Sequence, residues 1–365
     1  MHTRHRIRSM AVVVVALAVA AVACTSSDSN DTASDKGGDT TKATTVDLAS
    51  LTGTINGSGS SFQDALQQTV IDAFRKAAPE ATVNYTKSGS SAGKKDLAAR
   101  TVAFAGTDSL VKDEERAKFQ SDVLYFPIAA APITVSYNLD GVDQLHLSAD
   151  TLAGIFGGSI TTWDDAAIAA DNPDAKLPST KITVVHRSDG SGTTNNFTKY
   201  LTKAAAQKWT LGSGDTVQWP SGMQGAEKNS GVAALVSSTA GAIGYVDLAD
   251  AASANLMTAL IRNSSGKFVA PKLPAASAAL AGATLAEDLT FDPLDAEGAE
   301  SYPITAPTWV IVEAKQPDTA TVDLLKGYLE FLLTKGQEVA PTVGYAALPE
   351  KVVSKALDQL GKIEA

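Results

Sequence analysis

A stretch of charged, hydroxyl and glycine residues, Arg187 to Thr193, has the residue types of an anion-binding site. It follows Lys181 to Val185, a β-branched run that predicts a buried strand. It precedes Asn195 to Leu201, which predicts the start of a helix. The first N–H groups of a helix have no partner within the helix, and the helix dipole favours negative charge there. This order of elements therefore predicts an anion site at the helix N-terminus.

Side chains within the stretch add further donors. The guanidinium of Arg187 offers a fork of N–H groups, and Ser191 and Thr193 offer hydroxyls. Gly190 and Gly192 allow the backbone to approach a ligand closely. By itself the stretch also fits an ordinary capped helix with a surface arginine.

Two more Gly/Ser loops lie between a predicted strand and a predicted helix. One is Gly57 to Phe62, after a strand that begins at Ile55, and the other is Ser88 to Gly93. A third strand, Val102 to Gly106, is followed by an isolated acid, Asp108. Such loops collect at the carboxyl edge of an open α/β sheet, where ligands bind. Together they indicate one shared site, although each serine alone could be a helix cap and Asp108 alone a solvated acid.

Other candidates have simpler structural interpretations. Phe62 begins an apolar helix face, and Trp163 and Tyr245 are expected to be packing residues. His146 and His186 lack metal-ligand spacing, so we expect both to be structural and predict no metal site. No cofactor is expected.

Composition constrains the partners. The 365-residue chain has a formal net charge of −10. Removal of residues 1–23, with Arg4, Arg6 and Arg8 and no acid, leaves 27 basic and 40 acidic residues, or −13. This balance argues against nucleic acid as a partner. A small anion is still compatible, since a buried site binds through local hydrogen bonds.

The N-terminus has the pattern of a signal peptide over residues 1–23, with three arginines before a short apolar run. Cys24 is the sole cysteine and follows that run directly, as does the lipid-attachment cysteine of bacterial lipoproteins. Ala21 stands where lipoproteins prefer Leu, so ordinary signal-peptidase cleavage is the alternative. Residues 24–47 are rich in small polar residues and are expected to form a disordered tether.

The ordered set of motifs resembles the PstS family, the phosphate-binding components of bacterial ABC phosphate importers. The resemblance covers residues 50–355 and includes the three loops, Asp108 and later motifs such as Thr162 to Asp165, Gly241 to Tyr245 and Tyr302 to Thr305. It implies an α/β, type II-like periplasmic-binding-protein fold, with two mixed, mainly parallel sheets flanked by helices and joined by hinge crossovers. Alternating strands and helices along the chain agree with this class.

The resemblance also implies boundaries, ligands and partners. The first lobe would comprise residues 48–128 plus 304–365, and the second residues 129–303. Asp189 would orient Arg187 without touching phosphate. Permease subunits would be the protein partners, and the lipid would anchor the chain on the outer face of the cell membrane. The implied phosphate ligands are Ser61, Phe62, Ser90, Asp108, Arg187, Ser191, Gly192 and Thr193.

Two other functions stay open from the residues. A different tetrahedral oxyanion, sulfate or molybdate, would fit the same donors, but an acid such as Asp108 would repel an anion that carries no proton. A serine hydrolase is the alternative from another class, because Gly89 to Gly93 matches Gly-x-Ser-x-Gly with Ser91 as nucleophile. That enzyme would need a histidine after the acid, and no histidine follows His186. We therefore expect a binding protein and not an enzyme.

Overall fold

The computed structural model describes residues 47–365. The predicted signal peptide, Cys24 and the tether up to residue 46 lie outside the described residues. Within residues 47–365, no helix combines the length and the apolar composition needed to cross a bilayer.

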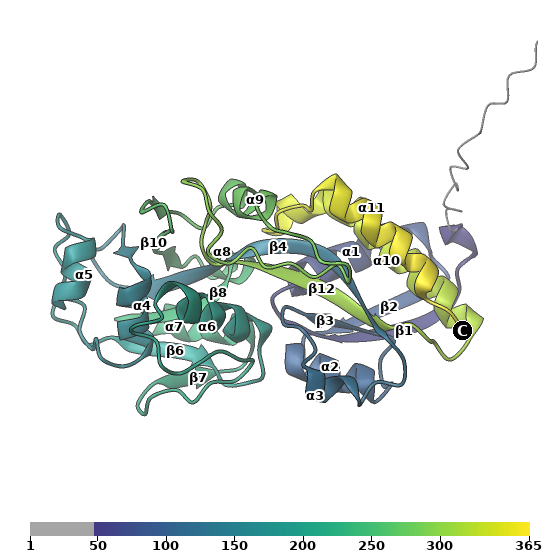
Figure 1. The fold of residues 1–365 in the computed structure, drawn as a ribbon, viewed down its shortest axis with the longest axis horizontal. Coiled ribbons are helices and arrows are strands. Elements are labelled where there is room, and N and C mark those ends of the chain that lie inside the picture. The colour runs from purple at the N-terminus through teal and green to yellow at the C-terminus, as the bar shows by residue number, and fades with distance from the viewer. Residues whose placement is uncertain (1–46) are drawn as a thin grey trace, which may run out of the picture. The chain divides into compact units, whose positions relative to one another are not determined.

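The described residues form an α/β fold around a nine-stranded mixed sheet, shown as a ribbon in Figure 1. Its strand order is β2-β1-β3-β12-β4-β8-β6-β7, and β9 also pairs with β4. The bounds are β1 Gly53–Gly59, β2 Ala81–Thr86, β3 Phe104–Thr107, β4 Val123–Asn138, β6 Thr183–Arg187, β7 Gln224–Ala226, β8 Ala242–Asp247, β9 Met257–Thr258 and β12 Thr305–Glu313. A smaller sheet contains β5 His146–Leu147, β10 Leu260–Arg262 and β11 Phe268–Val269.

The long strand β4 joins the two parts of the main sheet. Its first portion pairs antiparallel with β12, and its last portion pairs antiparallel with β8. We call the part containing β1, β2, β3 and β12 the β1 half, and the part containing β6, β7, β8 and β9 the β8 half. Within each half, neighbours at the outer edge run parallel, as β1 does with β2 and β6 does with β7. The two expected sheets thus share β4 and form one continuous sheet.

Helices flank both halves. In the β1 half, α1 and α10 pack on each other and on the sheet, whereas α2 packs on β1 and β3; Figure 1 shows α2 and α10 on opposite sides of these strands. In the β8 half, α6 and α7 pack on β8. The bounds of the α-helices are α1 Asp64–Ala77, α2 Ser90–Ala98, α3 Asp113–Arg116, α4 Ala149–Phe156, α5 Ala166–Asp171, α6 Gly192–Ala204, α7 Lys228–Ser238, α8 Leu248–Ser253, α9 Leu273–Ala281, α10 Thr319–Val339 and α11 Glu350–Gln359. Short 3-10 helices occupy Leu48–Ser50, Ala340–Val343 and Leu360–Lys362.

Burial explains why the expected helices form. In α1, the apolar residues Leu66, Val70 and Phe74 recur at helical spacing and are buried. The same logic holds for α10, in which Leu325, Leu329 and Leu332 are buried. In both helices the buried face is the one on which apolar residues recur at helical spacing in the sequence.

Residues 133–139 alternate in the sequence as a strand does, and β4 is longer than that run. It begins at Val123 and passes through Pro127 and Pro132, residues that normally argue against a strand interior. A register shift opposite Thr308 and Trp309 leaves Ile128 without a paired residue on β12, which is a β-bulge. The bulge lies directly beside Pro127, and bulges are among the places where sheets accept proline.

Candidate functional site

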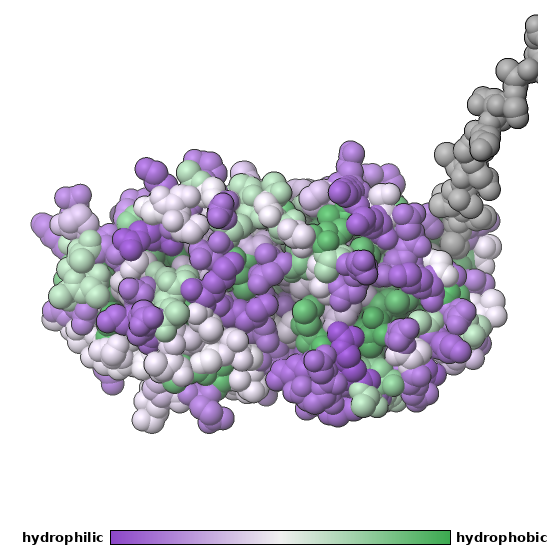
Figure 2. All heavy atoms as spheres, in the orientation of Figure 1, coloured by the Kyte–Doolittle hydropathy of each residue, from purple (hydrophilic) through white to green (hydrophobic). Residues whose placement is uncertain are grey.

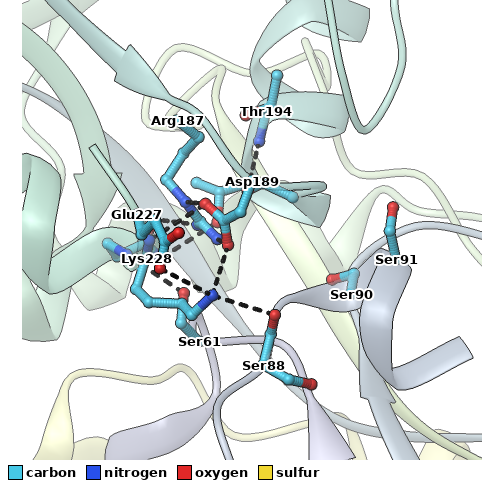
Figure 3. A network of polar contacts seen from close by, with 12 residues as sticks. Ser61, Ser88, Ser90, Ser91, Arg187, Asp189, Thr194, Glu227 and Lys228 are labelled. Carbon is cyan, nitrogen blue, oxygen red and sulfur yellow. Dashed lines mark hydrogen bonds and ion pairs between the residues drawn. The ribbon is translucent and has the colours of Figure 1, made fainter. Parts of the chain in front are cut away.

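Loops from both halves meet where five strands end. Ser61, Ser90 and Asp108 follow the ends of β1, β2 and β3. Arg187 ends β6, and Lys228 follows β7 at the start of α7. Figure 3 shows Ser61, Ser90, Arg187 and Lys228, which come from separate elements, around a common region. The site therefore lies at the carboxyl edge of the sheet, where the three predicted loops were expected to meet.

The loop after β1 places Ser61 and Phe62 at the start of α1, and both are buried. The hydroxyl of Ser61 accepts a hydrogen bond from the backbone N–H of Asn229, at 3.2 Å, in the opposite half. The backbone N–H of Phe62 donates to the Ser60 hydroxyl at 3.0 Å, and its carbonyl accepts from Tyr345 at 2.6 Å. The Phe62 ring lies in the core, so only its backbone faces the loop.

Asp108 lies at the end of β3 and is 2% exposed. Its Oδ2 accepts from the hydroxyls of Ser60, at 2.6 Å, and Ser90, at 3.4 Å. Its Oδ1 accepts from the Thr308 hydroxyl at 2.7 Å. Burial raises the pKa of Asp108 to about 6, although the two shorter hydroxyl bonds and Arg187 oppose the shift. The carboxylate is therefore the main form at pH 7, but its pKa lies closer to neutrality than its hydrogen bonds alone suggest.

Helix α6 begins at the site, with Ser191 as its N-cap. The Ser191 hydroxyl accepts from the backbone N–H of Thr194 at 3.2 Å, which is the ordinary capping bond. Gly192 and Thr193 form the first turn, and the Thr193 hydroxyl accepts from the Asn229 amide at 3.1 Å. The helix begins three residues before the sequence run at 195–201, so Gly192 and Thr193 belong to the helix and their N–H groups are N-terminal donors.

Arg187 ends β6 and is 4% exposed. Its Nε and Nη2 donate to the two carboxylate oxygens of Asp189 at 2.7 and 2.6 Å, and its Nη1 donates to Asn229 Oδ1, the side-chain amide oxygen, at 2.9 Å. Burial alone would raise the pKa of Asp189, but Arg187 and Lys228 lower it to about 2. The paired carboxylate fixes the guanidinium in one orientation (Figure 3).

Close packing brings the two sets of predicted ligands together. A Cβ built on Gly192 would lie 2.6 Å from both Asp108 Oδ2 and Ser90 Oγ. The Asn196 amide, one turn along α6, donates to the Asp108 carbonyl at 2.5 Å. The N-terminus of α6 thus faces the acid of the opposite half directly, and only glycine allows that approach.

Several residues at the site were not expected from the sequence. Ser60 and Thr308 donate to Asp108, and Tyr245 accepts from the backbone N–H of Arg187 at 3.1 Å while bonding to Thr194. Ser60 lies inside the predicted Gly/Ser loop at residues 57–62, so its position in the sequence is a signal for a role at the site. Thr308 is 200 positions from Asp108 and gave no local signal. Tyr245 was expected only to pack, yet its hydroxyl also supports the Arg187 backbone.

Asn229 is the most connected of the unexpected residues. It is fully buried at the start of α7 and contacts Ser61, Arg187 and Thr193, three of the predicted ligands. Its amide nitrogen also donates to Asp247 Oδ2 at 2.8 Å. The sequence around it, Lys-Asn-Ser-Gly, has weak helical character, which is why α7 was not expected.

The candidate nucleophile Ser91 lies in a different environment from a hydrolase serine. Its hydroxyl donates to Asp215 Oδ2 at 2.7 Å, and Lys94 Nζ lies 3.0 Å from the same oxygen. His186 stacks on Trp219 with its Nδ1 at 2.9 Å from the Arg187 carbonyl, and His146 stacks on Phe268. The stacking and hydrogen-bond contacts of both histidines are structural, and Ser91 has the Asp215 carboxylate as its partner.

The arrangement has a distinct chemical character. Donors dominate it: one guanidinium, several hydroxyls and the backbone N–H groups at the start of α6. Asp108 is the acid among the predicted ligands, and as a carboxylate it can only accept hydrogen bonds. Such a set suits a small oxyanion that still carries a proton, because each anion oxygen can accept while the P–OH or equivalent group donates to Asp108.

Comparison with known proteins places the chain among binding proteins. Residues 31–335 match the family model for the PBP superfamily domain. The chain is 35% identical over 307 residues to the phosphate-binding protein PstS of Xylella fastidiosa, covering 82% of this chain and 83% of that protein. It is also 35% identical over 316 residues to the phosphate-binding protein PstS of Pasteurella multocida, covering 85% of this chain and 91% of the relative.

Solved structures share the fold. A high-affinity periplasmic phosphate-binding protein with bound phosphate matches with a TM-score of 0.71 at 22% identity, over 84% of this chain and 94% of that one. A putative phosphate ABC transporter substrate-binding protein from Clostridium perfringens, also with bound phosphate, matches with a TM-score of 0.59 at 18% identity, over 81% and 100% of the two chains. At these identities the likeness concerns the fold.

Proposed function

From the premise that this chain belongs to the PBP superfamily and, within it, to the PstS family of phosphate-binding proteins, we propose that it binds inorganic phosphate between its two halves and delivers it to an ABC permease. The single observation that carries the proposal is the setting of Asp108. A buried acid lies against the α6 N-terminus, among the predicted anion donors. A carboxylate in an anion-binding site repels an anion unless that anion carries an O–H group that can donate to it.

The ligands we propose are those that the family pattern assigns to this sequence. Arg187, Ser191, Gly192 and Thr193 bind from the β8 half, and Ser61, Phe62, Ser90 and Asp108 bind from the β1 half. Asp189 holds Arg187, and Asn229 holds the side chains around it. The donors offset the negative charge, and Asp108 accepts the phosphate O–H.

We also propose the division into lobes. Residues 48–128 plus 304–365 form one lobe and residues 129–303 the other, with β4 and the segment before β12 as crossovers. The strand pairings support this division, because β4 changes partner from β12 to β8 along its length. Opening at these crossovers would admit phosphate, since the site in its closed form is buried.

Membrane attachment is a separate proposal that depends on residues 1–24 alone. Cleavage before Cys24 and lipidation of its thiol would anchor the chain on the outer face of the cell membrane, beside the permease. The family provides the extracytoplasmic setting, and the lone cysteine after the apolar run supports the anchor.

Competing functions have weaker support. Sulfate or molybdate would place an unprotonated oxyanion against Asp108, and the relatives are named for phosphate. The hydrolase hypothesis needs a histidine that contacts the Ser91 hydroxyl. In the structure that hydroxyl donates to Asp215, and Lys94 contacts the same carboxylate. We therefore propose a binding protein without catalytic activity.

Native mass spectrometry tests the proposal. Protein purified without added phosphate, then exposed to equal concentrations of phosphate, sulfate and molybdate, should retain one phosphate per chain. Retention of sulfate or molybdate, or of no anion, would overturn the assignment. Hydrolysis of a p-nitrophenyl ester that is lost in Ser91→Ala would instead revive the enzyme hypothesis.

A further inference from the structure

Lys228 has an unusual backbone at the candidate site. It lies between β7 and the body of α7 with φ at +62°, in the left-handed region that non-glycine residues seldom adopt. Glycine would adopt this conformation without strain. A strained residue at a site suggests that its side chain has a use there, and the contacts of Lys228 identify one.

The backbone N–H and the side-chain ammonium of Lys228 both donate to the Asp189 carboxylate. Its backbone N–H donates to Asp189 Oδ1 at 3.1 Å, and its ammonium donates to Asp189 Oδ2 at 3.1 Å. Asp189 in turn holds Arg187 through two further bonds. The Lys228 side chain is 24% exposed, so its charge is partly shielded from water.

The ammonium also reaches the opposite half. It donates to the backbone carbonyl of Ser88 at 3.2 Å, across the site, as Figure 3 shows. Ser88 lies in the loop after β2, directly before Gly89, and a Cβ on Gly89 would lie 2.9 Å from Asp189 Oδ2. One cation therefore contacts the Arg187–Asp189 pair on its own half and the phosphate-site loop on the other.

We propose that Lys228 is a positioning residue that couples the Arg187–Asp189 pair to closure of the two halves, and so slows release of the bound anion. The inference rests on the proposed function and extends it to a residue outside the predicted ligand set. The ammonium is placed to contact Ser88 when the halves are together, because the two groups belong to different halves. Separation of the halves breaks this bond, while the bond to Asp189 persists within the β8 half.

The test compares phosphate release in Lys228→Met, Lys228→Arg and wild-type protein by stopped-flow displacement. Lys228→Met keeps the length of the side chain and removes the ammonium, so the release rate should rise about three- to tenfold, with a smaller change in the association rate. Lys228→Arg should restore most of the slow release, since a guanidinium can donate to both acceptors. A Lys228→Met release rate equal to wild type would overturn the proposal.

Lys203→Met is the matched control. The Lys203 ammonium donates to the Leu294 carbonyl at 2.7 Å, and both residues belong to the β8 half. This variant loses the same charge and the same kind of bond without affecting contact between the halves. Its release rate should equal that of wild type. A rise as large as in Lys228→Met would show that loss of any nearby positive charge speeds release, and would overturn the coupling role.

A second readout separates this inference from the proposed function. Small-angle X-ray scattering of ligand-free protein should show a larger radius of gyration for Lys228→Met than for wild type and Lys203→Met, because fewer molecules are closed. An unchanged radius together with unchanged release contradicts the role of Lys228. Wild-type protein that fails to bind phosphate contradicts the proposed function, and the scattering comparison still tests Lys228.

Discussion

At the scale of single residues, the orientation of Arg187 depends on two neighbours. Asp189 takes two of its donors and Asn229 takes a third. The sequence motif made Asp189 a candidate for this role, because the two residues are close in the chain. Asn229 gave no such signal, since it reaches Arg187 from a different helix.

Arg187→Ala should weaken phosphate binding by at least ~1.5–3 kcal/mol, the range for a hydrogen bond to a charged group, or about 10- to 150-fold in Kd. Arg187→Lys should recover only part of the loss, because an ammonium cannot replace the planar guanidinium that Asp189 and Asn229 orient. Isothermal titration calorimetry measures both. An unchanged Kd in Arg187→Ala would remove this residue from the site.

The pKa of Asp108 gives a prediction on stability. Its pKa in the folded protein, about 6, lies above the ordinary value of 3.8, so the folded state binds this proton more tightly than the unfolded state. The resulting stabilisation is present in full below pH 4 and is lost as pH rises through 6. Asp108→Asn, which carries no charge to bury, should therefore gain stability over wild type as pH rises.

Thermal unfolding of ligand-free wild type and Asp108→Asn at pH 5 and pH 8 measures this effect. The difference in Tm, variant minus wild type, should be more positive at pH 8. A difference that is constant between the two pH values would show that the pKa of Asp108 is not raised.

At the scale of elements, the N-terminus of α6 is the most constrained part of the site. The sequence indicated a helix after the Gly/Ser stretch, but its spacing placed the start at Asn195 and not at Gly192. The apolar pattern begins only with Phe197, because the first turn faces the site and not the core. Local hydrophobic periodicity is therefore a poor guide to where a ligand-binding helix begins.

Gly192→Ala tests the close approach of α6 to the opposite half. The added methyl group would lie 2.6 Å from Asp108 Oδ2 and Ser90 Oγ, so the halves could not close as they do here. Phosphate affinity should fall at least about tenfold, while alanine in place of glycine within a helix should not lower Tm. Calorimetry and thermal unfolding on the same sample separate the two effects.

Gly231→Ala is the control for that experiment. In α7 an added Cβ would make only ordinary contact with Ala226, at 3.6 Å. This variant should bind phosphate as wild type does. Equal affinities for Gly192→Ala and wild type would mean that α6 does not approach Asp108 in the bound protein.

At the scale of the whole molecule, the alternation of strands and helices predicts an α/β fold and the meeting of three loops, and the family resemblance implies the two-lobed class. In the β1 half, β2 alternates buried and exposed residues and α1 buries one apolar face, so both follow local rules of alternation and periodicity. The sharing of β4 between both halves does not, because Pro127 and Pro132 obscure the strand and its partners lie far away in the chain. Thr308 and Asn229 were missed for the same reason: tertiary contacts alone bring them to the site.

The proposed lipid anchor at Cys24 would determine where in the cell the whole chain is located. Cys24→Ala removes the thiol to which lipid would be attached, so the protein should move from the membrane fraction to the soluble or secreted fraction. Fractionation followed by immunoblotting measures this, with wild-type protein as the reference. Retention of Cys24→Ala in the membrane fraction would reject lipidation at this residue.

The central claim is that Asp108 lets a phosphate site reject sulfate. Both anions are tetrahedral and similar in size, but only phosphate keeps a proton near pH 7 that the Asp108 carboxylate can accept. As pH falls through about 6, Asp108 gains a proton and can donate, so the penalty against sulfate should decrease.

The most direct measurement is competition calorimetry with phosphate and sulfate at pH 7.5 and pH 5, on wild type and Asp108→Asn. Wild-type protein should bind one phosphate per chain at pH 7.5 and ignore millimolar sulfate, with sulfate competing measurably at pH 5. Asp108→Asn should bind phosphate and admit sulfate at both pH values. Wild-type protein that binds sulfate as tightly as phosphate at pH 7.5 would contradict both the role of Asp108 and the proposed function.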